Sequence, residues 1–244
     1  MGVNAQGSDE TVLKVSGLNA FYGRAHILFD VELDVARGEV VALMGRNGAG
    51  KSTTMKAVMG MLPGTIGRVA FRGRDISGAQ PFQIARLGLG FVPEDRRVFT
   101  DLTVLQNLEV GRQPPRPGAV TWTPEKLFAL FPNLGEMPHR PGGQMSGGEQ
   151  QMLTVARTLM GNPHLVLLDE PSEGVAPLIV EQMAQMIVTL KREGMAILLS
   201  EQNLHFAELV SDRAYVLENG RIRYQGPMQA LAADEELRRT TLAV

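Results

Sequence analysis

The residues best suited to chemistry lie in a glycine-rich stretch, GRNGAGKS at Gly45–Ser52. The stretch matches the phosphate-binding pattern GxxxxGK[ST] without a gap, and it joins the apolar run Val40–Met44 to a helical run, Thr53–Met61. Glycines allow backbone N–H groups to close around phosphate oxygens, and the start of the following helix adds positive potential. An ordinary glycine-rich turn between a strand and a helix is the alternative. The residues expected to contact a bound nucleotide here are Gly45, Asn47, Gly48, Gly50, Lys51, Ser52 and Thr53.

Two of these side chains have defined chemical roles in phosphoryl transfer. Lys51 would place its ammonium charge on the β- and γ-phosphates, and the Ser52 hydroxyl is a ligand for Mg²⁺. An acidic pair supplies the groups that are still missing, since Leu165–Leu168 ends in Asp169 and Glu170. The carboxyl end of a buried parallel strand lies at the ligand edge of its sheet. We therefore expect Asp169 to bind Mg²⁺ and Glu170 to act as general base on water.

A third stretch, MSGGE at Met145–Glu149, precedes a periodic helix. Ser146 and Glu149 have the spacing of an S-x-x-E capping box, which explains both residues structurally. A capping box does not explain Gly147 and Gly148, which weaken a first helical turn. Glycines in this position suit a backbone that a phosphate must approach closely.

The order of apolar segments predicts an α/β fold with a mainly parallel core sheet. Four short continuous apolar runs suggest strands that are buried on both faces, and helical patterns lie between them. The N-terminal part alternates more and predicts a smaller antiparallel sheet. The expected buried strands are Val40–Met44, Leu89–Val92, Leu165–Leu168 and Ala196–Leu199; the expected antiparallel strands are Val12–Val15, Val31–Val35 and Arg68–Arg72; the expected helices include one after Ser146, one at Ile179–Arg192 and one at Met228–Leu242.

Composition sets limits on the kind of protein. The chain has 244 residues, of which 44% are hydrophobic and 20% charged, which is ordinary for a globular domain. A net charge of −2 gives no reason to expect a nucleic-acid partner, and the absence of cysteine excludes disulfides and thiolate metal sites. The N-terminus has no basic start followed by an apolar run, and no apolar stretch approaches the roughly 20 residues of a membrane span.

With these motifs in place, the chain resembles the ATP-binding cassette ATPases over nearly its whole length. GRNGAGKS resembles the family's Walker A motif, LVLLDE its Walker B motif with the catalytic glutamate, and MSGGE its signature motif. Tyr22 matches the aromatic residue that stacks on adenine. The resemblance implies one cassette domain over 1–244, with a helical subdomain inserted at about 83–160 and a C-terminal helix at 225–244. ATP and Mg²⁺ are the implied substrate and cofactor.

Within that family the chain is most similar to the LivF-type subunits of branched-chain amino acid importers. The matching phrases are PEDRRVFTDLTVLQNL at 93–108, DEPSEGVAPLIVE at 169–181, SEQN at 200–203 and DRAYVLENGRI at 212–222. In this family the Walker A motif of one subunit faces the signature motif of another across ATP. The resemblance therefore implies that Ser146, Gly147 and Gly148 contact the nucleotide of a partner, either a second copy or a LivG-like paralogue.

Four positions depart from the commonest cassette pattern. Glu94 stands where a glutamine bridges Mg²⁺ and the permease, so it is expected to contact both metal and nucleotide. Glu149 replaces the last glutamine of the signature, and Ala176 replaces a switch aspartate. Gln202 stands where a histidine contacts the γ-phosphate. Its amide can donate a hydrogen bond but cannot ionise. Gln202 is then a working phosphate sensor, a mark of a slow site, or an amide that caps a strand end.

The leading expectation for function is an ATP-hydrolysing motor subunit of an amino acid importer at the cytoplasmic face of the membrane. Its expected partners are permease subunits, a second ATPase subunit and, indirectly, a solute-binding protein. The alternatives are an ATPase for uptake of amides, urea or aromatic acids, an ATPase for lipid export, and a nucleotide-binding regulatory subunit with little turnover.

Overall fold

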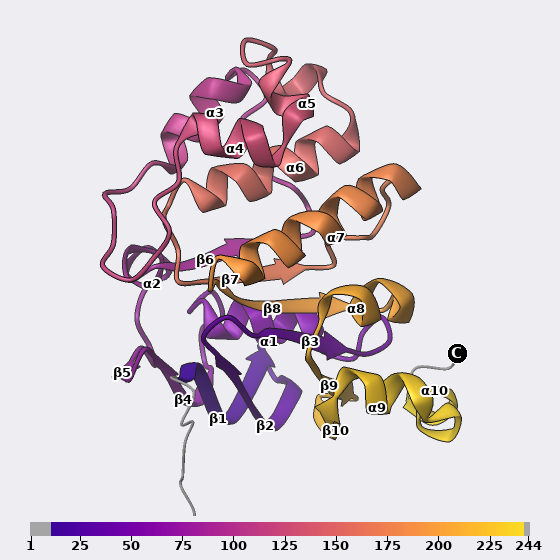
Figure 1. Cartoon of the computed structure of the whole chain (residues 1–244). Coiled ribbons are helices and arrows are strands. Elements are labelled where there is room, and N and C mark those ends of the chain that lie inside the picture. The colour runs from indigo at the N-terminus through magenta and orange to yellow at the C-terminus, as the bar shows by residue number, and fades with distance from the viewer. Residues whose placement is uncertain (1–10, 242–244) are drawn as a thin grey trace, which may run out of the picture.

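A six-stranded sheet forms the centre of the molecule in the computed structural model, which describes residues 11–241 (Figure 1). The strand order is β10-β9-β3-β8-β7-β6, and every neighbouring pair is parallel except β9 and β10. The four predicted buried strands are all present, two of them slightly longer than expected. The strands are β3 (Val40–Met44), β6 (Leu89–Val92), β7 (Leu165–Asp169), β8 (Ala196–Glu201), β9 (Arg213–Glu218) and β10 (Arg221–Pro227).

The core strands read as continuous apolar runs because they are buried on both faces. In β3, Val40, Ala42 and Met44 belong to a hydrophobic cluster shared with the helical part, whereas Val41 and Leu43 face a second cluster shared with the N-terminal sheet. All five β3 residues are buried. Each apolar residue therefore has a packing partner on whichever face it occupies.

The second sheet has four strands in the order β2-β1-β4-β5, and its neighbouring strands pair antiparallel, as the alternating N-terminal pattern predicts. Its first two strands are much longer than predicted. Register shifts at several positions of β1 break the alternation, so that the sequence pattern reveals only part of each strand. The strands are β1 (Thr11–Tyr22), β2 (Ala25–Ala36), β4 (Ile66–Phe71) and β5 (Arg74–Asp75).

Helices cover the core sheet, and several of them form a lobe on one side of it (Figure 1). The lobe contains α3 (Val104–Gly111), α4 (Pro124–Leu130), α5 (Pro132–Gly135) and the longer α6 (Gly147–Leu159). No helix or strand is assigned between Arg112 and Thr123. The remaining helices are α1 (Lys51–Val58), α2 (Pro81–Arg86), the 3-10 turn η1 (Gly142–Gln144), α7 (Pro177–Arg192), α8 (Leu204–Val210), α9 (Met228–Ala233) and α10 (Glu235–Thr241).

Two expected boundaries differ from the structure. The range 83–160 was expected as a helical insertion, but Leu89–Val92 forms β6 and pairs with β7 in the core sheet. A parallel edge strand places that segment in the core. At the C-terminal end, one helix is expected over 225–244, but β10 continues to Pro227. The helical part is split into α9 and α10 at Asp234, which has an extended conformation. Residues 1–10 and 242–244 lie outside the described residues.

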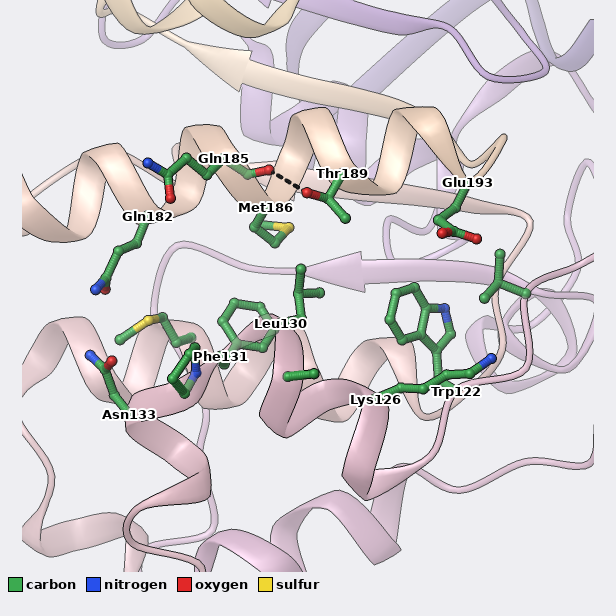
Figure 2. Close-up of a pocket in the computed structure, with 14 residues that line it drawn as sticks. Trp122, Lys126, Leu130, Phe131, Asn133, Gln182, Gln185, Met186, Thr189 and Glu193 are labelled. Atoms are coloured by element: carbon green, nitrogen blue, oxygen red, sulfur yellow. Dashed lines mark hydrogen bonds between the residues drawn. The ribbon is translucent and has the colours of Figure 1, made fainter.

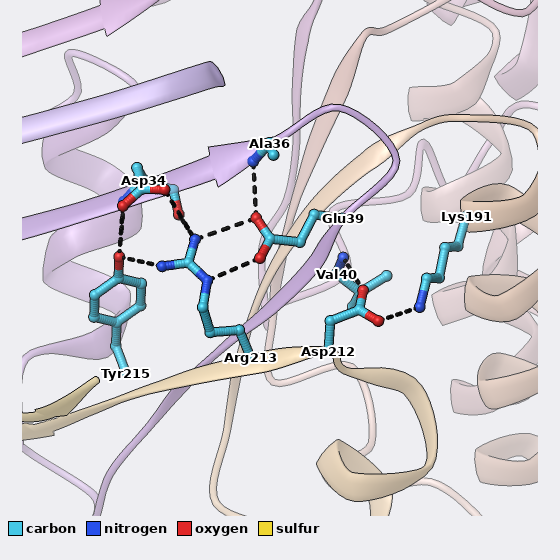
Figure 3. A network of polar contacts seen from close by, with 8 residues as sticks. All are labelled: Asp34, Ala36, Glu39, Val40, Lys191, Asp212, Arg213 and Tyr215. Atoms are coloured by element: carbon cyan, nitrogen blue, oxygen red, sulfur yellow. Dashed lines mark hydrogen bonds and ion pairs between the residues drawn. The ribbon is translucent and has the colours of Figure 1, made fainter. Parts of the chain in front are cut away.

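A polar network joins the two sheets on the side away from the lobe (Figure 3). Arg213 of β9 is 2.8 Å from the Glu39 carboxylate through Nε and 2.9 Å from the Asp34 carboxylate through Nη2. Tyr215 donates its hydroxyl proton to Asp34 at 2.9 Å. The guanidinium is only 19% exposed, so its charge depends on these two carboxylates. The network fixes β2 of the outer sheet against β9 of the core.

Candidate functional site

The glycine-rich loop connects β3 to α1, and its glycines are required by packing as well as by backbone conformation. A Cβ atom on Gly45 would lie 2.4 Å from the carbonyl oxygen of Leu217. Gly50 has a φ of 111°, a region that side chains rarely adopt, and a Cβ there would lie 2.7 Å from the Leu28 side chain. The loop therefore holds a shape that no other residue type allows at these two positions. Its outer side, at Arg46–Ala49, lines a cavity of about 220 Å³.

Lys51, the first residue of α1, turns its ammonium group back into this loop. The side chain is 3% exposed, and Nζ donates to the carbonyl oxygens of Gly45 at 2.8 Å and Arg46 at 3.2 Å. Nζ also lies 3.0 Å from Oε1 of Glu170. The predicted phosphate-binding lysine and the predicted general base are thus direct neighbours, although 119 positions separate them in the sequence (170 − 51).

Asp169 ends β7 and accepts hydrogen bonds from two serine hydroxyls. Ser52 donates to Oδ1 at 3.0 Å and Ser200 donates to the same oxygen at 2.6 Å. Burial raises the pKa of Asp169, while the two hydroxyl hydrogen bonds act in the opposite direction. Ser52 and Asp169 are therefore brought together as predicted. Ser200, in the stretch ILLSEQN, is a member of this cluster that the sequence did not single out.

The oxygen atoms of Ser52 and Asp169 suit a hard divalent cation. Mg²⁺ is bound in proteins by one or two carboxylates together with substrate phosphates, rather than by a cage of protein ligands. Residues 11–241 contain no group of three or more His, Cys, Asp or Glu side chains placed to hold a metal by themselves. The donor set therefore fits a cation that arrives with a nucleotide.

Glu170 follows directly and is held in an uncommon conformation. Its φ is 47°, its side chain is 7% exposed, and its backbone N–H donates to Oγ of Ser200 at 3.1 Å. Non-glycine residues with positive φ are strained unless the surroundings fix them. Burial by itself would raise the pKa of Glu170, but hydrogen bonds with Glu173 and Lys51 outweigh it and leave the pKa below its ordinary value. The carboxylate is thus kept ionised, as a general base must be.

Glu173 belongs to the same loop, and no sequence motif pointed to it. A hydrogen bond with Glu170 is the main cause that raises the pKa of Glu173 to about 7, with smaller effects from burial and from the charges of Glu94 and Glu201. Only a local charge count could have pointed to it, since Glu170 and Glu173 lie three positions apart. One of the two carboxyl groups therefore retains its proton near neutral pH.

Gln202 connects the base to the phosphate loop. Its Nε2 donates to Oδ1 of Asn47 at 2.6 Å and is 3.3 Å from Oε2 of Glu170. The amide thus contacts two other predicted site residues instead of only capping the end of β8. This arrangement places an uncharged donor beside the base, a role that an amide can fill without ionising.

Two other predicted site residues, Tyr22 and Glu94, lie outside the cluster around Lys51 and Glu170. Tyr22 ends β1 and is 46% exposed, as a stacking surface would be. Glu94 lies in an exposed loop after β6, and no hydrogen bond or ion pair of the described residues joins it to Ser52 or Asp169. The predicted contacts of Glu94 with a metal ion and with nucleotide stay predictions.

Ser146 begins α6 with the capping box that the sequence suggests, since its Oγ accepts from the N–H of Glu149 at 3.3 Å. The two glycines that follow have packing reasons of their own. A Cβ atom on Gly147 would lie 2.3 Å from Arg96 Nη1, and one on Gly148 would lie 2.6 Å from Ile179. No hydrogen bond within the described residues joins this helix start to the loop at Gly45–Ser52. The structure thus has two separate candidate phosphate-binding elements.

A separate cavity of about 620 Å³ lies between the lobe and α7 (Figure 2). Its walls include Trp122, Phe131, Met152 and Met186, and none of the predicted site residues contributes to it. The indole Nε1 of Trp122 is buried and has no hydrogen-bond partner among the described residues. The cavity therefore lies between lobe and core, away from the phosphate loop, and its walls are both apolar and polar.

Comparison with known proteins identifies the family. The model of the ABC transporter family matches residues 28–173, which include the phosphate loop and the Asp169–Glu170 pair. The chain belongs to the ABC transporter ATPases. The high-affinity branched-chain amino acid transport ATP-binding protein BraG of Pseudomonas aeruginosa is 41% identical over 93% of this chain and 97% of BraG. The probable branched-chain amino acid transport ATP-binding protein LivF of Archaeoglobus fulgidus is 33% identical over 96% of this chain and 99% of LivF.

A different transport system also appears among the relatives of this ABC ATPase. The lipopolysaccharide export ATP-binding protein LptB of Escherichia coli is 32% identical over 91% of this chain and 93% of LptB. Among solved structures, a nucleotide-free ATP-binding cassette of an ABC transporter has a TM-score of 0.80 and 27% identity, covering 96% of this chain and 99% of that one. The expected family and fold are therefore confirmed, and the protein binds ATP. None of the helices within residues 11–241 has the length and apolar character needed to cross a membrane.

Proposed function

We propose that this ABC ATPase powers an importer of branched-chain amino acids from the cytoplasmic face of the membrane. The single observation that supports branched-chain amino acids as the solute is the similarity of this chain to BraG. The identity to BraG is 41%, compared with 32% to LptB at comparable coverage. The phrases that resemble LivF-type subunits in the sequence support the same assignment.

The proposed reaction uses the groups that the fold brings to the edge of the core sheet. Lys51 and the loop amides hold the phosphates of ATP, and Ser52 with Asp169 would bind Mg²⁺. That ion, when bound, neutralises the charge that develops on the transferred phosphoryl group. Glu170 accepts a proton from the attacking water, and Gln202 donates a hydrogen bond on the γ-phosphate side of the base. The buried Lys51–Glu170 pair, 3.0 Å apart, indicates that the lysine holds the base in place until phosphate enters.

Completion of the site requires a second subunit. Ser146, Gly147 and Gly148 form a helix start that makes no hydrogen bond with the chain's own phosphate loop. We propose that this helix start contacts the γ-phosphate of ATP held by a partner, either a second copy or a LivG-like paralogue. ATP then favours the closed pair, and its hydrolysis releases the pair.

A groove between the lobe and the α2–β6 edge of the core supports docking to a permease. Its volume is about 560 Å³, and Phe82, Phe99 and Val110 on its walls are 57%, 47% and 53% exposed. Exposed apolar side chains gathered around one hollow mark a protein contact rather than a solvated surface. The groove is also adjacent to the loop that carries Glu94, through Phe91 and Phe99. Binding there would connect a permease to the nucleotide site.

Reconstitution tests the solute. The chain is purified with the permease and the solute-binding protein encoded beside it, placed in liposomes with ATP inside, and supplied with labelled leucine. We expect leucine uptake that is lost with Glu170→Gln and is competed by isoleucine and valine but not by urea, acetamide or phenylalanine. Uptake of one of those three compounds in place of leucine would refute the proposed solute while leaving the ATPase assignment intact.

Lipid export is the second candidate, favoured by the LptB similarity of 32%. Purification of the native complex distinguishes the two, because an importer ATPase copurifies with permeases that act with a solute-binding protein. Stable copurification with lipid-exporting permeases alone would favour export.

A regulatory role with little turnover is the third candidate. The contacts of Gln202 suggest a variant that tests it. Because Gln202 contacts Glu170 and Asn47, we expect Gln202→Ala to lower kcat about tenfold, the effect of losing one hydrogen bond of about 1.4 kcal/mol to a charged group. Gln202→His should retain activity, since histidine also donates a hydrogen bond. An alanine variant as fast as wild type would show that Gln202 is not a phosphate sensor.

A further inference from the structure

One buried carboxylate close to the site has no role in the proposed reaction. Glu201 ends β8 and is 2% exposed. Burial is the main influence on its carboxyl group and raises the pKa of Glu201. No ion pair of the described residues involves it. A buried carboxylate without a cation must be stabilised by hydrogen-bond donors.

Backbone N–H groups supply those donors from two different segments. The Ser172 N–H donates to Oε1 of Glu201 at 3.1 Å. The N–H groups of Gln202 and Asn203 donate to Oε2 at 3.1 Å and 3.2 Å. Each carboxylate oxygen thus serves one segment: Oε1 the loop after Glu170, and Oε2 the turn that carries Gln202.

Both segments end at the reacting groups. Ser172 lies two positions after Glu170, whose positive φ of 47° persists only if the surrounding loop is fixed. Gln202 makes its 3.3 Å contact with Glu170 from the other segment. We infer that Glu201 is a positioning residue for ATP hydrolysis, which clamps the Glu170 loop against the Gln202 turn. The inference rests on the proposed roles of Glu170 and Gln202.

The chemistry of the clamp requires an acceptor on both oxygens. The three N–H groups and the Ser172 side chain all donate hydrogen bonds to Glu201, so a glutamine of the same length would turn its NH₂ group toward at least one N–H. Either orientation of the amide then breaks the link to one of the two segments and leaves a buried donor unpaired. Aspartate keeps both acceptors but is one methylene shorter. It can still reach the adjacent Gln202 and Asn203 amides better than the distant Ser172 amide.

A structural clamp without catalytic consequence is the competing explanation, and a matched variant separates the two. Glu39 is also a partly buried carboxylate that accepts a backbone N–H, from Ala36 at 2.8 Å, but it lies in the network around Arg213. Glu39→Gln therefore makes the same chemical change outside the nucleotide site. We expect it to lower stability and to leave kcat within twofold of wild type.

The test compares turnover with ATP affinity in wild type, Glu201→Gln, Glu201→Asp and Glu39→Gln, each in complex with the partner subunit and permease. For Glu201→Gln we expect kcat to fall at least tenfold while the Kd for a fluorescent ATP analogue changes less than twofold. The kcat of Glu201→Asp should lie between those of wild type and Glu201→Gln. If Glu201→Gln does not fold, the same comparison is made with Glu201→Asp alone.

Hydrogen exchange without nucleotide gives a second readout. Peptides that cover 170–174 and 202–206 should exchange faster in Glu201→Gln, whereas peptides of β1 and β2 should not. The inference is overturned by a kcat within twofold of wild type, by a parallel loss of kcat and ATP affinity, or by unchanged exchange in both peptides. A harmless Glu170→Gln would overturn it too, because no base would remain to be positioned. Failure of leucine uptake alone would overturn only the proposed solute.

Discussion

Replacement of Glu170 by glutamine tests the assignment of the general base most directly. The variant keeps the size of the side chain and its contact with Gln202, but it removes the only carboxylate within residues 11–241 that lies within hydrogen-bond reach of Lys51. Because an amide cannot accept the proton of the attacking water, we expect ATP to bind and hydrolysis to stop. ATP should then hold the chain in a closed pair with its partner.

The size of the expected effect follows from two terms. Loss of a general base lowers a rate by roughly 10²–10⁴-fold, which is about 3–5 kcal/mol of activation free energy. The Lys51–Glu170 attraction at 3.0 Å is about 5 kcal/mol before desolvation at an effective dielectric constant near 20. Desolvation of the carboxylate offsets much of that attraction, and Lys51 keeps its bonds to Gly45 and Arg46. The free energy of unfolding should therefore fall by less than the roughly 3–5 kcal/mol that is typical when one partner of a buried ion pair is removed.

Phosphate release, ATP affinity and the elution volume of the complex in ATP are the three measurements. Glu39→Gln serves as the control for the change from carboxylate to amide. Glu170→Gln should release phosphate at least a hundredfold more slowly, bind ATP as tightly as wild type or more tightly, and elute as a larger species with ATP. Phosphate release faster than one-tenth of the wild-type rate would refute the assignment of Glu170 as the base.

Three further predictions concern stability. Arg213→Met should lower the free energy of unfolding by about 2–4 kcal/mol in urea titrations, because Glu39 and Asp34 lose their common cation (Figure 3); a loss below about 1 kcal/mol would make the network unimportant. Trp122→Phe should change stability by less than about 1 kcal/mol, because the indole N–H has no hydrogen-bond partner to lose among the described residues; thermal melting checks this. The pKa of Glu173 is raised from 4.5 to about 7, so the folded state holds a proton that the unfolded state lacks between these values, and stability falls as the pH rises through that window. In urea titrations without nucleotide, wild type should therefore lose more stability than Glu173→Gln between pH 5 and pH 8, and equal losses would contradict the shift.

Features that depend only on neighbouring residues could be predicted from the amino-acid sequence. The glycines of Gly45–Ser52 and the capping box at Ser146 are local, because backbone conformation and the first hydrogen bonds of a helix involve only a few consecutive residues. The buried strands were also readable, since burial on both faces demands an unbroken apolar run. The lengths of β1 and β2 were not, because their bulges interrupt the alternation.

The packing of distant segments sets which side chains meet at the site. The order β3-β8-β7 places the ends of three strands side by side, and this brings Lys51, Glu170 and Gln202 into contact. Ser200 and Glu201 acquire their partners through the same order. Local propensity does not specify strand order, because the order depends on packing between segments that lie far apart in the sequence, such as β3 and β8. The sequence therefore predicted Lys51, Asp169, Glu170 and Gln202, whereas the sheet set their distances, added Ser200, and brought Glu201 between two segments of the site.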